Sequence, residues 1–247
     1  MADWKKTTRR FGFLAGLALA ALIPGLPAKA AGAFHAPKGC TGFLTVQMRG
    51  CLVSNHYHCK GDAKGDQLRV DFDDQGPFFA TRTNAETEWL ETYDLSSGTY
   101  EVLEPHGKAP ASFSRLLKTG ADRYDFVMRA EDGGIEHVTG YDKLTGVKRS
   151  VSGVTLEQTA YVTQSVDAKG KLLWKSQGHE WISREFGLFF AGTGLWQDDQ
   201  GKTKFDNTPA LLLKPGQQGF MSTTPEFDCN TVLSQLSLPT PKDEVIQ

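Results

Sequence analysis

Three of the four cysteines and two of the six histidines of this chain fall within one short segment, Cys40–Cys59. Cys51, His56, His58 and Cys59 offer two sulfur and two imidazole ligands, and histidines separated by one residue face the same side of a strand. Zinc and copper accept such ligands, so a metal-binding protein or metal-dependent enzyme centred on His56 and His58 is one hypothesis. The spacing matches no common zinc motif. The Cys-x-x-Cys of redox dithiols and the Cys-x-x-Cys-His of covalent haem are absent, so we expect no cofactor.

The other chemistry open to these sulfur atoms is disulfide formation. An even number of cysteines in an exported chain indicates covalent pairs, and Cys40, Cys51, Cys59 and Cys229 allow three pairings. Bonded Cα atoms lie within about 7 Å, whereas a straight strand from Cys51 to Cys59 would span roughly 26 Å, so that pair needs a turn. We expect one local bridge and one that fastens the C-terminal region, where a bond to Cys229 is worth about 5 kcal/mol in the chain-entropy estimate.

Residues 1–30 decide which of these two chemistries is favoured. Basic residues up to Arg10 precede an apolar stretch, Phe11–Leu26, and Ala28-Lys29-Ala30 has the small-x-small form of a signal-peptidase site. About 16 apolar residues are fewer than the roughly 20 of a membrane-spanning helix. We therefore predict a cleaved export signal, a periplasmic protein and no membrane span after cleavage. Arg9-Arg10 followed by Phe13-Leu14 resembles a twin-arginine signal, and the general secretory route stays open as well.

The composition of the remainder limits the class of protein. Residues 1–30 hold five of the 27 basic residues and one of the 29 acidic ones, which leaves 22 basic and 28 acidic residues, a net charge of about −6 with histidine neutral. No basic stripe is left to bind phosphates, so nucleic acid is not expected as a partner. The length and a hydrophobic content of 39% suit one domain. We predict a single β-rich domain over residues 31–238 and a flexible tail over residues 239–247.

Strand-like runs follow one another along this domain. They alternate polar and apolar residues and are rich in β-branched and aromatic side chains, which is typical of half-buried strands. The predicted strands cover residues 43–48, 67–73, 77–82, 88–93, 99–103, 124–129, 135–141, 147–151, 156–166, 171–176 and 180–191. Two helices are predicted, one over residues 111–119 between an N-capping Ser112 and a C-capping Gly120, the other over residues 228–236.

Turns with Asp at the first position and Gly at the fourth separate many of these runs. Such an aspartate bonds to the backbone two residues on, and the glycine takes the left-handed conformation. Calcium ligation would need a different spacing of the aspartates. Hairpin turns this frequent indicate neighbouring antiparallel strands, so we predict a mainly β fold, an antiparallel meander that forms a curled sheet, half-barrel or sandwich. The turns lie at residues 62–65, 73–76, 167–170 and 198–201, with longer ones at 93–98 and 141–146 and another at 131–134.

Aromatic residues are concentrated between Trp174 and Trp196. In a regular strand over residues 180–191, Phe186 and Phe190 would share one face and Trp181 and Phe189 the other. Such a strand is either central to a packed core or lines an apolar cavity. The candidate cavity residues are Phe78, Phe79, Trp174, Trp181, Phe186, Phe189, Phe190 and Trp196.

The turn Asp167-Ala-Lys-Gly170 followed by Lys171-Leu-Leu, and the later Glu180-Trp-Ile-Ser-Arg184, resemble segments of the periplasmic lipoprotein-carrier family. The resemblance, in the general pattern of strands and turns, extends over residues 66–191. It implies a half-open barrel closed by helices that carries acyl chains, and it assigns no functional residue.

Motifs of the common hydrolases, metalloproteases and nucleotide-binding enzymes are absent. The sequence therefore favours an exported, non-enzymatic protein that binds an apolar, lipid-like small molecule or an envelope protein. A purely structural or adhesive role is the remaining class.

Overall fold

A computed structural model of the chain describes residues 32–105 and 107–229. The described residues form thirteen strands in one antiparallel sheet and one short helix, which confirms the predicted mainly β fold. The predicted export signal, the tail 239–247 and residues 230–236 of the second predicted helix lie outside these residues. The elements are β1 (Cys40–Met48), β2 (Leu52–Cys59), β3 (Gln67–Phe72), β4 (Pro77–Thr83), β5 (Trp89–Asp94), β6 (Thr99–Leu103), α1 (Phe113–Thr119), β7 (Ala121–Ala130), β8 (Ile135–Val151), β9 (Val154–Asp167), β10 (Leu172–Ser183), β11 (Leu188–Asp198), β12 (Gly201–Asp206) and β13 (Pro209–Leu213).

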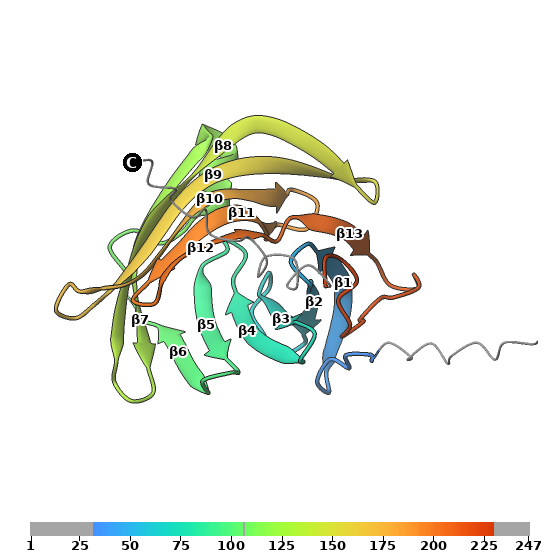
Figure 1. Cartoon of the computed structure of the whole chain (residues 1–247), viewed down its shortest axis with the longest axis horizontal. Helices are drawn as coiled ribbons and strands as arrows, with labels where there is room; N and C mark the ends of the chain where they lie inside the picture. The colour runs from blue at the N-terminus through green and yellow to red at the C-terminus, as the bar shows by residue number, and fades with distance from the viewer. Residues whose placement is uncertain (1–31, 106, 230–247) are drawn as a thin grey trace, which may run out of the picture. The chain divides into compact units, whose positions relative to one another are not determined.

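The sheet is a meander in which each strand from β1 to β12 pairs with the next one along the chain. The last strand, β13, returns to pair with β1, so β12 and β13 are the two edges. Figure 1 shows that the sheet is strongly curved: the long strands β8 to β11 arch over β1 to β5. One face of the sheet is therefore turned inward, toward another part of the same sheet.

Several of the predicted aspartate turns are present with the expected hydrogen bonds, although Asp62 of the turn predicted at residues 62–65 accepts none and its Oδ2 is buried without a partner in the described part of the chain. Oδ1 of Asp73 accepts from the backbone N–H groups of Gln75 and Gly76 at 2.8 and 2.9 Å. Asp167 and Asp198 close the β9–β10 and β11–β12 turns in the same way. Local side-chain chemistry thus sets the hairpin connections, as the sequence predicted.

Two predicted elements are wrong. Residues 180–191 are not one strand: β10 ends at Ser183, the chain turns at residues 184–187, and β11 begins at Leu188. Residues 141–146 are not a turn but part of the continuous strand β8, where the pairing with β9 shifts between Leu144 and Lys148. The left-handed Gly146, with φ of 85°, serves this bulge rather than a hairpin.

A hydrophobic core joins the two ends of the curved sheet. Leu44 and Val46 of β1 and Leu212 of β13 pack with Leu156 of β9 and Phe190 of β11, and all five are nearly fully buried. Burial of each such side chain contributes roughly 1.5–3 kcal/mol. Because β1 and β11 are far apart in the order of the sheet, this core fixes the curvature and thereby the space enclosed farther along the inner face.

The outer face of β1 and β2 is covered by the segment that follows β13. Gln47 and Asn55, both fully buried, bond through their side chains to the backbone of this segment, at Thr224 and Ser222 respectively. Disulfides join Cys40 to Cys59 and Cys51 to Cys229. This is the predicted combination of one local bridge and one that fastens the C-terminal region.

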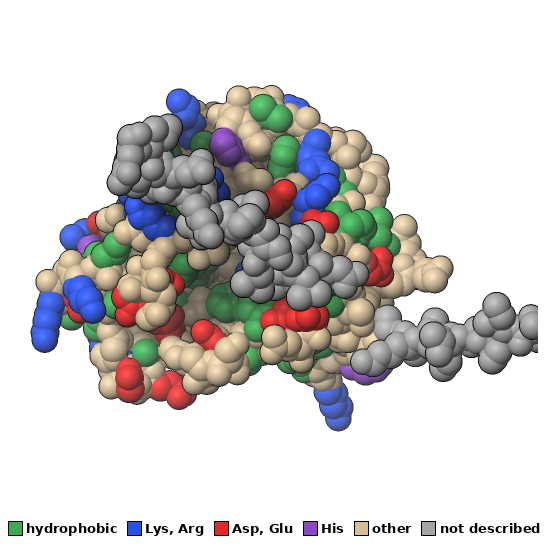
Figure 2. Space-filling model, in the orientation of Figure 1, with side chains coloured by type: hydrophobic (Ala, Val, Ile, Leu, Met, Phe, Trp, Pro, Cys, Tyr) green, Lys and Arg blue, Asp and Glu red, His purple; other side chains and the backbone are tan. Residues whose placement is uncertain are grey.

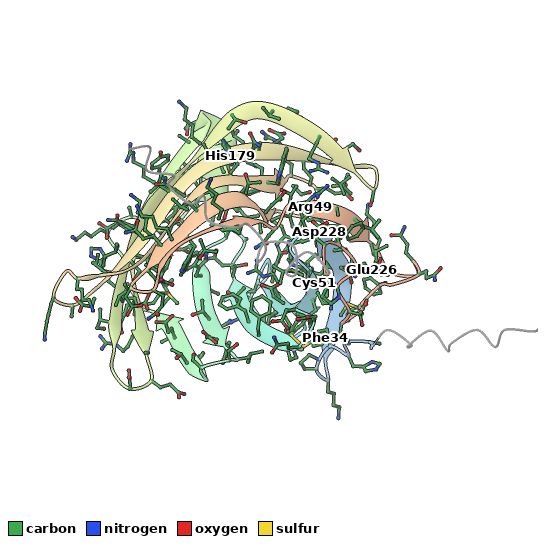
Figure 3. The ribbon with its side chains drawn as sticks, in the orientation of Figure 1. Phe34, Arg49, Cys51, His179, Glu226 and Asp228 are labelled. Atoms are coloured by element: carbon green, nitrogen blue, oxygen red, sulfur yellow. A yellow bond between two sulfur atoms is a disulfide. The ribbon has the colours of Figure 1, made fainter. Side chains whose placement is uncertain are left out.

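Figure 3 shows the surroundings of the Cys51–Cys229 disulfide, where Cys51 lies close to Arg49 and Asp228. An ion pair of 3.3 Å joins the guanidinium of Arg49 to the carboxylate of Asp228 beside this disulfide. The covalent bond and the ion pair hold the two segments together at the same place. The segment that precedes β1 packs on the sheet as well: the ring of Phe34 lies against the rings of Tyr57 and Phe72, at centroid distances of 5.6 and 5.7 Å.

Helix α1 has the predicted caps. Ser112 accepts a hydrogen bond from the N–H of Arg115, and Gly120 takes the left-handed conformation with φ of 81°. The buried side chains Phe113 and Leu116 pack on Ile182 and its neighbours. The helix therefore lies against the inner face of the long strands.

Candidate ligand-binding cavity

A cavity of about 650 Å³ lies between the two arms of the inner face, and residues of strands β2 to β11 and of α1 contribute to its wall. This volume is within the roughly 300–1,000 Å³ of small-molecule sites. In Figure 2 the molecule is hollowed near the centre of the view, with hydrophobic side chains in the hollow and acidic side chains around it.

One wall of the cavity is a polar row that crosses five neighbouring strands. The residues of the row are register partners from strand to strand, so their side chains project from the same face of the sheet. The row consists of His56, Arg69, Thr81, Thr92 and Glu101.

A stack of tryptophans from β5, β10 and β11 lines another part of the cavity. The rings of Trp174 and Trp196 are stacked with centroids 5.1 Å apart, and Trp89 follows at 6.4 Å from Trp174. Phe126 packs edge-on against Trp89 at 5.6 Å. Ten aromatic residues line the cavity in all, which makes its wall suited to a large apolar or aromatic body.

Hydroxyl groups interrupt this aromatic surface along β9. The hydroxyl of Tyr124 is 2.5 Å from that of Thr163, and the hydroxyl of Tyr161 is 2.7 Å from that of Ser176. A Cβ on Gly140 would lie 2.6 Å from the Tyr124 oxygen, so the absence of a side chain there lets the Tyr124 ring lie over β8. Burial raises the pKa of Tyr124 well above its usual range and that of Tyr161 to about 12.

Two carboxyl groups, Glu180 on β10 and Asp142 on β8, project into the cavity on either side of β9. Glu180 is opposite Thr159 and Asp142 is opposite Tyr161, two residues apart on β9, so both face inward. Burial, followed by the charge of Asp142, raises the pKa of Glu180 to about 8, although Arg69 opposes this shift. Burial and the charge of Asp122 raise the pKa of Asp142 to about 7.

Several deeply buried polar atoms of the wall have no hydrogen-bond partner among residues 32–105 and 107–229, and two of them matter most for a ligand. These two are Nε2 of His56, a residue 2% exposed, and Oδ1 of Asp142, a residue 7% exposed; Oε1 of Gln67 and Nε of Arg69, also on the wall, likewise have no hydrogen-bond partner there. Burial, with the charges of Arg69 and His58, lowers the pKa of His56 well below its usual value, which keeps this imidazole neutral. A buried polar atom without a partner is destabilising, and a ligand in the cavity could supply what is missing.

Five of the eight aromatic residues proposed from the sequence lie on the cavity wall, and three do not. Trp181 packs in the core that joins the sheet ends, and Phe186 lies next to Phe43. Phe78 does not line the cavity and is half-buried. Because the chain turns at residues 184–187, the alternation of faces predicted for a single strand does not apply to Trp181 and Phe186. The five on the wall are Phe79, Trp174, Phe189, Phe190 and Trp196.

The histidines proposed as metal ligands are divided between two environments. His56 is buried in the polar row, whereas the exposed His58 stacks on Phe43 at 4.2 Å, with Nδ1 3.1 Å from the carbonyl oxygen of Asp66. All four sulfur atoms are held in disulfides and are not available as ligands. Within the described part of the chain, no three histidine, cysteine, aspartate or glutamate residues are placed to hold a metal ion together.

Sequence reasoning did not identify Arg69, Asp142 or Glu180 as cavity residues. A signal was present in β9, where the hydroxyl residues Thr159, Tyr161, Thr163 and Ser165 occupy every second position. The structure buries these four hydroxyl residues on the inner face. A strand that turns hydroxyl groups inward is unusual for a packed core and indicates a polar interior.

No helix within residues 32–105 and 107–229 has the length and apolar character needed to cross a membrane. The chain matches no protein-family model, no curated protein and no solved structure.

Proposed function

We propose that this protein is a non-enzymatic binding protein that takes up a small molecule with a large apolar part in the cavity between the arms of its sheet. The observation that carries the proposal is the cavity itself, about 650 Å³ and lined by ten aromatic residues. A well-packed interior has no void of that size, and apolar cavities with a few convergent polar groups are typical of ligand sites.

The second part of the proposal concerns the compartment. Two disulfides hold all four cysteines, and disulfides persist in oxidising surroundings. They are consistent with export, and we propose the periplasm as the site of action. Cell fractionation with mass determination of the N-terminus tests this: a cytosolic protein that keeps residues 1–30 would refute it.

Uptake of N-phenyl-1-naphthylamine, an uncharged probe that becomes fluorescent in apolar surroundings, tests the binding function directly. Trp174 and Trp196 lie on the wall, so energy transfer from tryptophan to the bound probe should accompany binding. Native mass spectrometry after gentle purification would show a ligand acquired in the cell. Absence of both probe uptake and any co-purified molecule refutes the proposal.

A variant that fills the cavity separates internal binding from binding at the surface. Thr81 is in the polar row on the cavity wall, whereas Thr155 on β9 is exposed. We expect Thr81→Trp to weaken probe binding at least tenfold and the matched control Thr155→Trp to leave it unchanged. Equal binding by both variants would show that the probe sits elsewhere.

A further inference from the structure

The charged residues of the cavity wall are strongly unbalanced. Arg69 is the one lysine or arginine among the residues that line it, against six carboxylates. The remaining wall consists of aromatic, aliphatic and hydroxyl-bearing residues together with the uncharged His56 and Gln67. The six acidic residues are Asp94, Glu101, Asp122, Glu136, Asp142 and Glu180.

Four of these carboxylates already have partners within the protein. Asp122 forms an ion pair with Arg115, and Glu136 accepts hydrogen bonds from Ser165 and from the indole N–H of Trp174. Thr92 donates to Glu101, and the backbone of the β5–β6 turn donates to Asp94. Each of these four carboxylates is therefore already satisfied, by an ion pair or by hydrogen bonds, within the protein.

Glu180 and Asp142 differ from these four. In the described part of the chain no group donates a hydrogen bond to either carboxylate, and Oδ1 of Asp142 is buried without a partner. Arg69 does not complete the pair: its Nε lies 3.1 Å from Asp71, and its guanidinium lies over the ring of Phe79 at 5.7 Å. Two acceptors therefore face the same cavity, and no described group donates a hydrogen bond to either.

We propose, building on the binding function above, that the ligand carries a positive charge, as an alkyl or aryl amine or a quaternary ammonium group held by Glu180 and Asp142. Its apolar body lies along Trp89, Trp174 and Trp196. A cation supplies the charge that two desolvated carboxylates lack, and an ammonium group near tryptophan faces gains cation–π attraction. An anionic head group at this place would meet like charges.

The protonation of the pair should be linked to ligand binding. Without a ligand, burial favours the protonated carboxyls, whose pKa values are raised. A bound cation favours the ionised carboxylates, so binding releases protons and tightens as pH rises through about 7 to 8. The charged and titratable groups that face the pair are Arg69 on β3, His56 on β2, Asp122 and Tyr124 on β7, and Tyr161 on β9.

Three probes with the same twelve-carbon chain separate charge from hydrophobicity. Dodecyltrimethylammonium, dodecanol and dodecanesulfonate compete against N-phenyl-1-naphthylamine below their micelle concentrations, at pH 6 and pH 9. A quaternary ammonium does not itself titrate, so any pH dependence belongs to the protein. At pH 9 we expect the cation to bind at least tenfold more tightly than the alcohol and the sulfonate to bind most weakly. Affinity for the cation should rise at least tenfold from pH 6 to pH 9.

The variant Glu180→Gln/Asp142→Asn removes the charges at nearly constant volume, and Glu131→Gln in the exposed β7–β8 turn is the control. We expect the double variant to bind the cation no better than dodecanol at either pH, with dodecanol binding unchanged; each single variant should lose part of the preference. Equal affinity of the wild type for the three chains, or a preference that survives in the double variant, would overturn the charge assignment alone. Failure of all three chains to displace a bound probe would also overturn the charge assignment, whereas failure of the probe itself to bind, with no co-purified molecule, would refute the binding function.

Discussion

Replacing Glu180 by glutamine is expected to stabilise the folded protein at high pH and to leave its stability unchanged at low pH. The physical reason is the raised pKa of this carboxyl, about 8 in the folded protein against an ordinary value of 4.5. Between these two values the folded protein binds a proton that the unfolded chain has released. The stability that the protonated Glu180 carboxyl contributes is therefore fully present below about pH 4.5 and is lost as the pH rises toward 8.

The size of the effect follows from the same two values. Each unit of difference between folded and unfolded pKa corresponds to 1.36 kcal/mol, which gives a ceiling of about 5 kcal/mol for Glu180 above pH 8. Because the carboxyl faces a cavity that water can enter, we expect about 2 to 4 kcal/mol of this to be realised. Glutamine has no charge to bury, so Glu180→Gln should regain that amount at pH 9.

Urea denaturation, followed by tryptophan fluorescence and far-ultraviolet circular dichroism, measures the effect at pH 5, 7 and 9. The free energy of unfolding of the wild type should fall across this range, and that of Glu180→Gln should fall by about 2 to 4 kcal/mol less. The exposed control Glu131→Gln should follow the wild type. Parallel pH profiles for the wild type and Glu180→Gln would refute the view that this carboxyl is desolvated in the folded protein.

Two further predictions concern the fold. Replacing Cys51 and Cys229 together by alanine should lower the free energy of unfolding by up to about 5 kcal/mol, because their bond closes a loop of 178 residues. Urea denaturation measures this loss. The same replacement of Cys40 and Cys59, whose bond spans 19 residues, should cost about 3 kcal/mol, and a loss for the Cys51–Cys229 pair no larger than that would contradict the prediction. Leu156→Ala, in the fully buried core between β9 and β1, should cost about 2–5 kcal/mol in the same assay, whereas the exposed Leu95→Ala should cost less than 1 kcal/mol.

The cavity links these stability effects to the proposed function. Placing Glu180 and Asp142 in a desolvated interior reduces stability at neutral and higher pH, and the core around Leu156 and the C-terminal disulfide provide stability elsewhere. Binding sites commonly contain such unfavourable buried groups, which a ligand then satisfies. A cationic ligand should consequently raise the apparent stability of the wild type most at high pH.

Local features of this protein were accessible from the sequence because they depend on neighbours in the chain. The aspartate turns at Asp73 and Asp167, the helix between Ser112 and Gly120, and the alternating strands all rest on hydrogen bonds or side-chain preferences within a few residues. The hairpin at residues 184–187 was missed, since this stretch has no Asp-x-x-Gly pattern and apolar residues flank it on both sides.

The amino-acid sequence by itself determined the antiparallel meander, the capped helix, and a disulfide framework with one local and one C-terminal bridge. Only the tertiary structure decided which face of each strand is the inner one and which distant strands meet. The contact of Leu44 with the far end of the sheet, and the electrostatic interaction of Glu180 on β10 with Arg69 on β3, depend on how strongly the whole sheet curves. That curvature is set by packing between residues more than one hundred positions apart, and no local pattern encodes it.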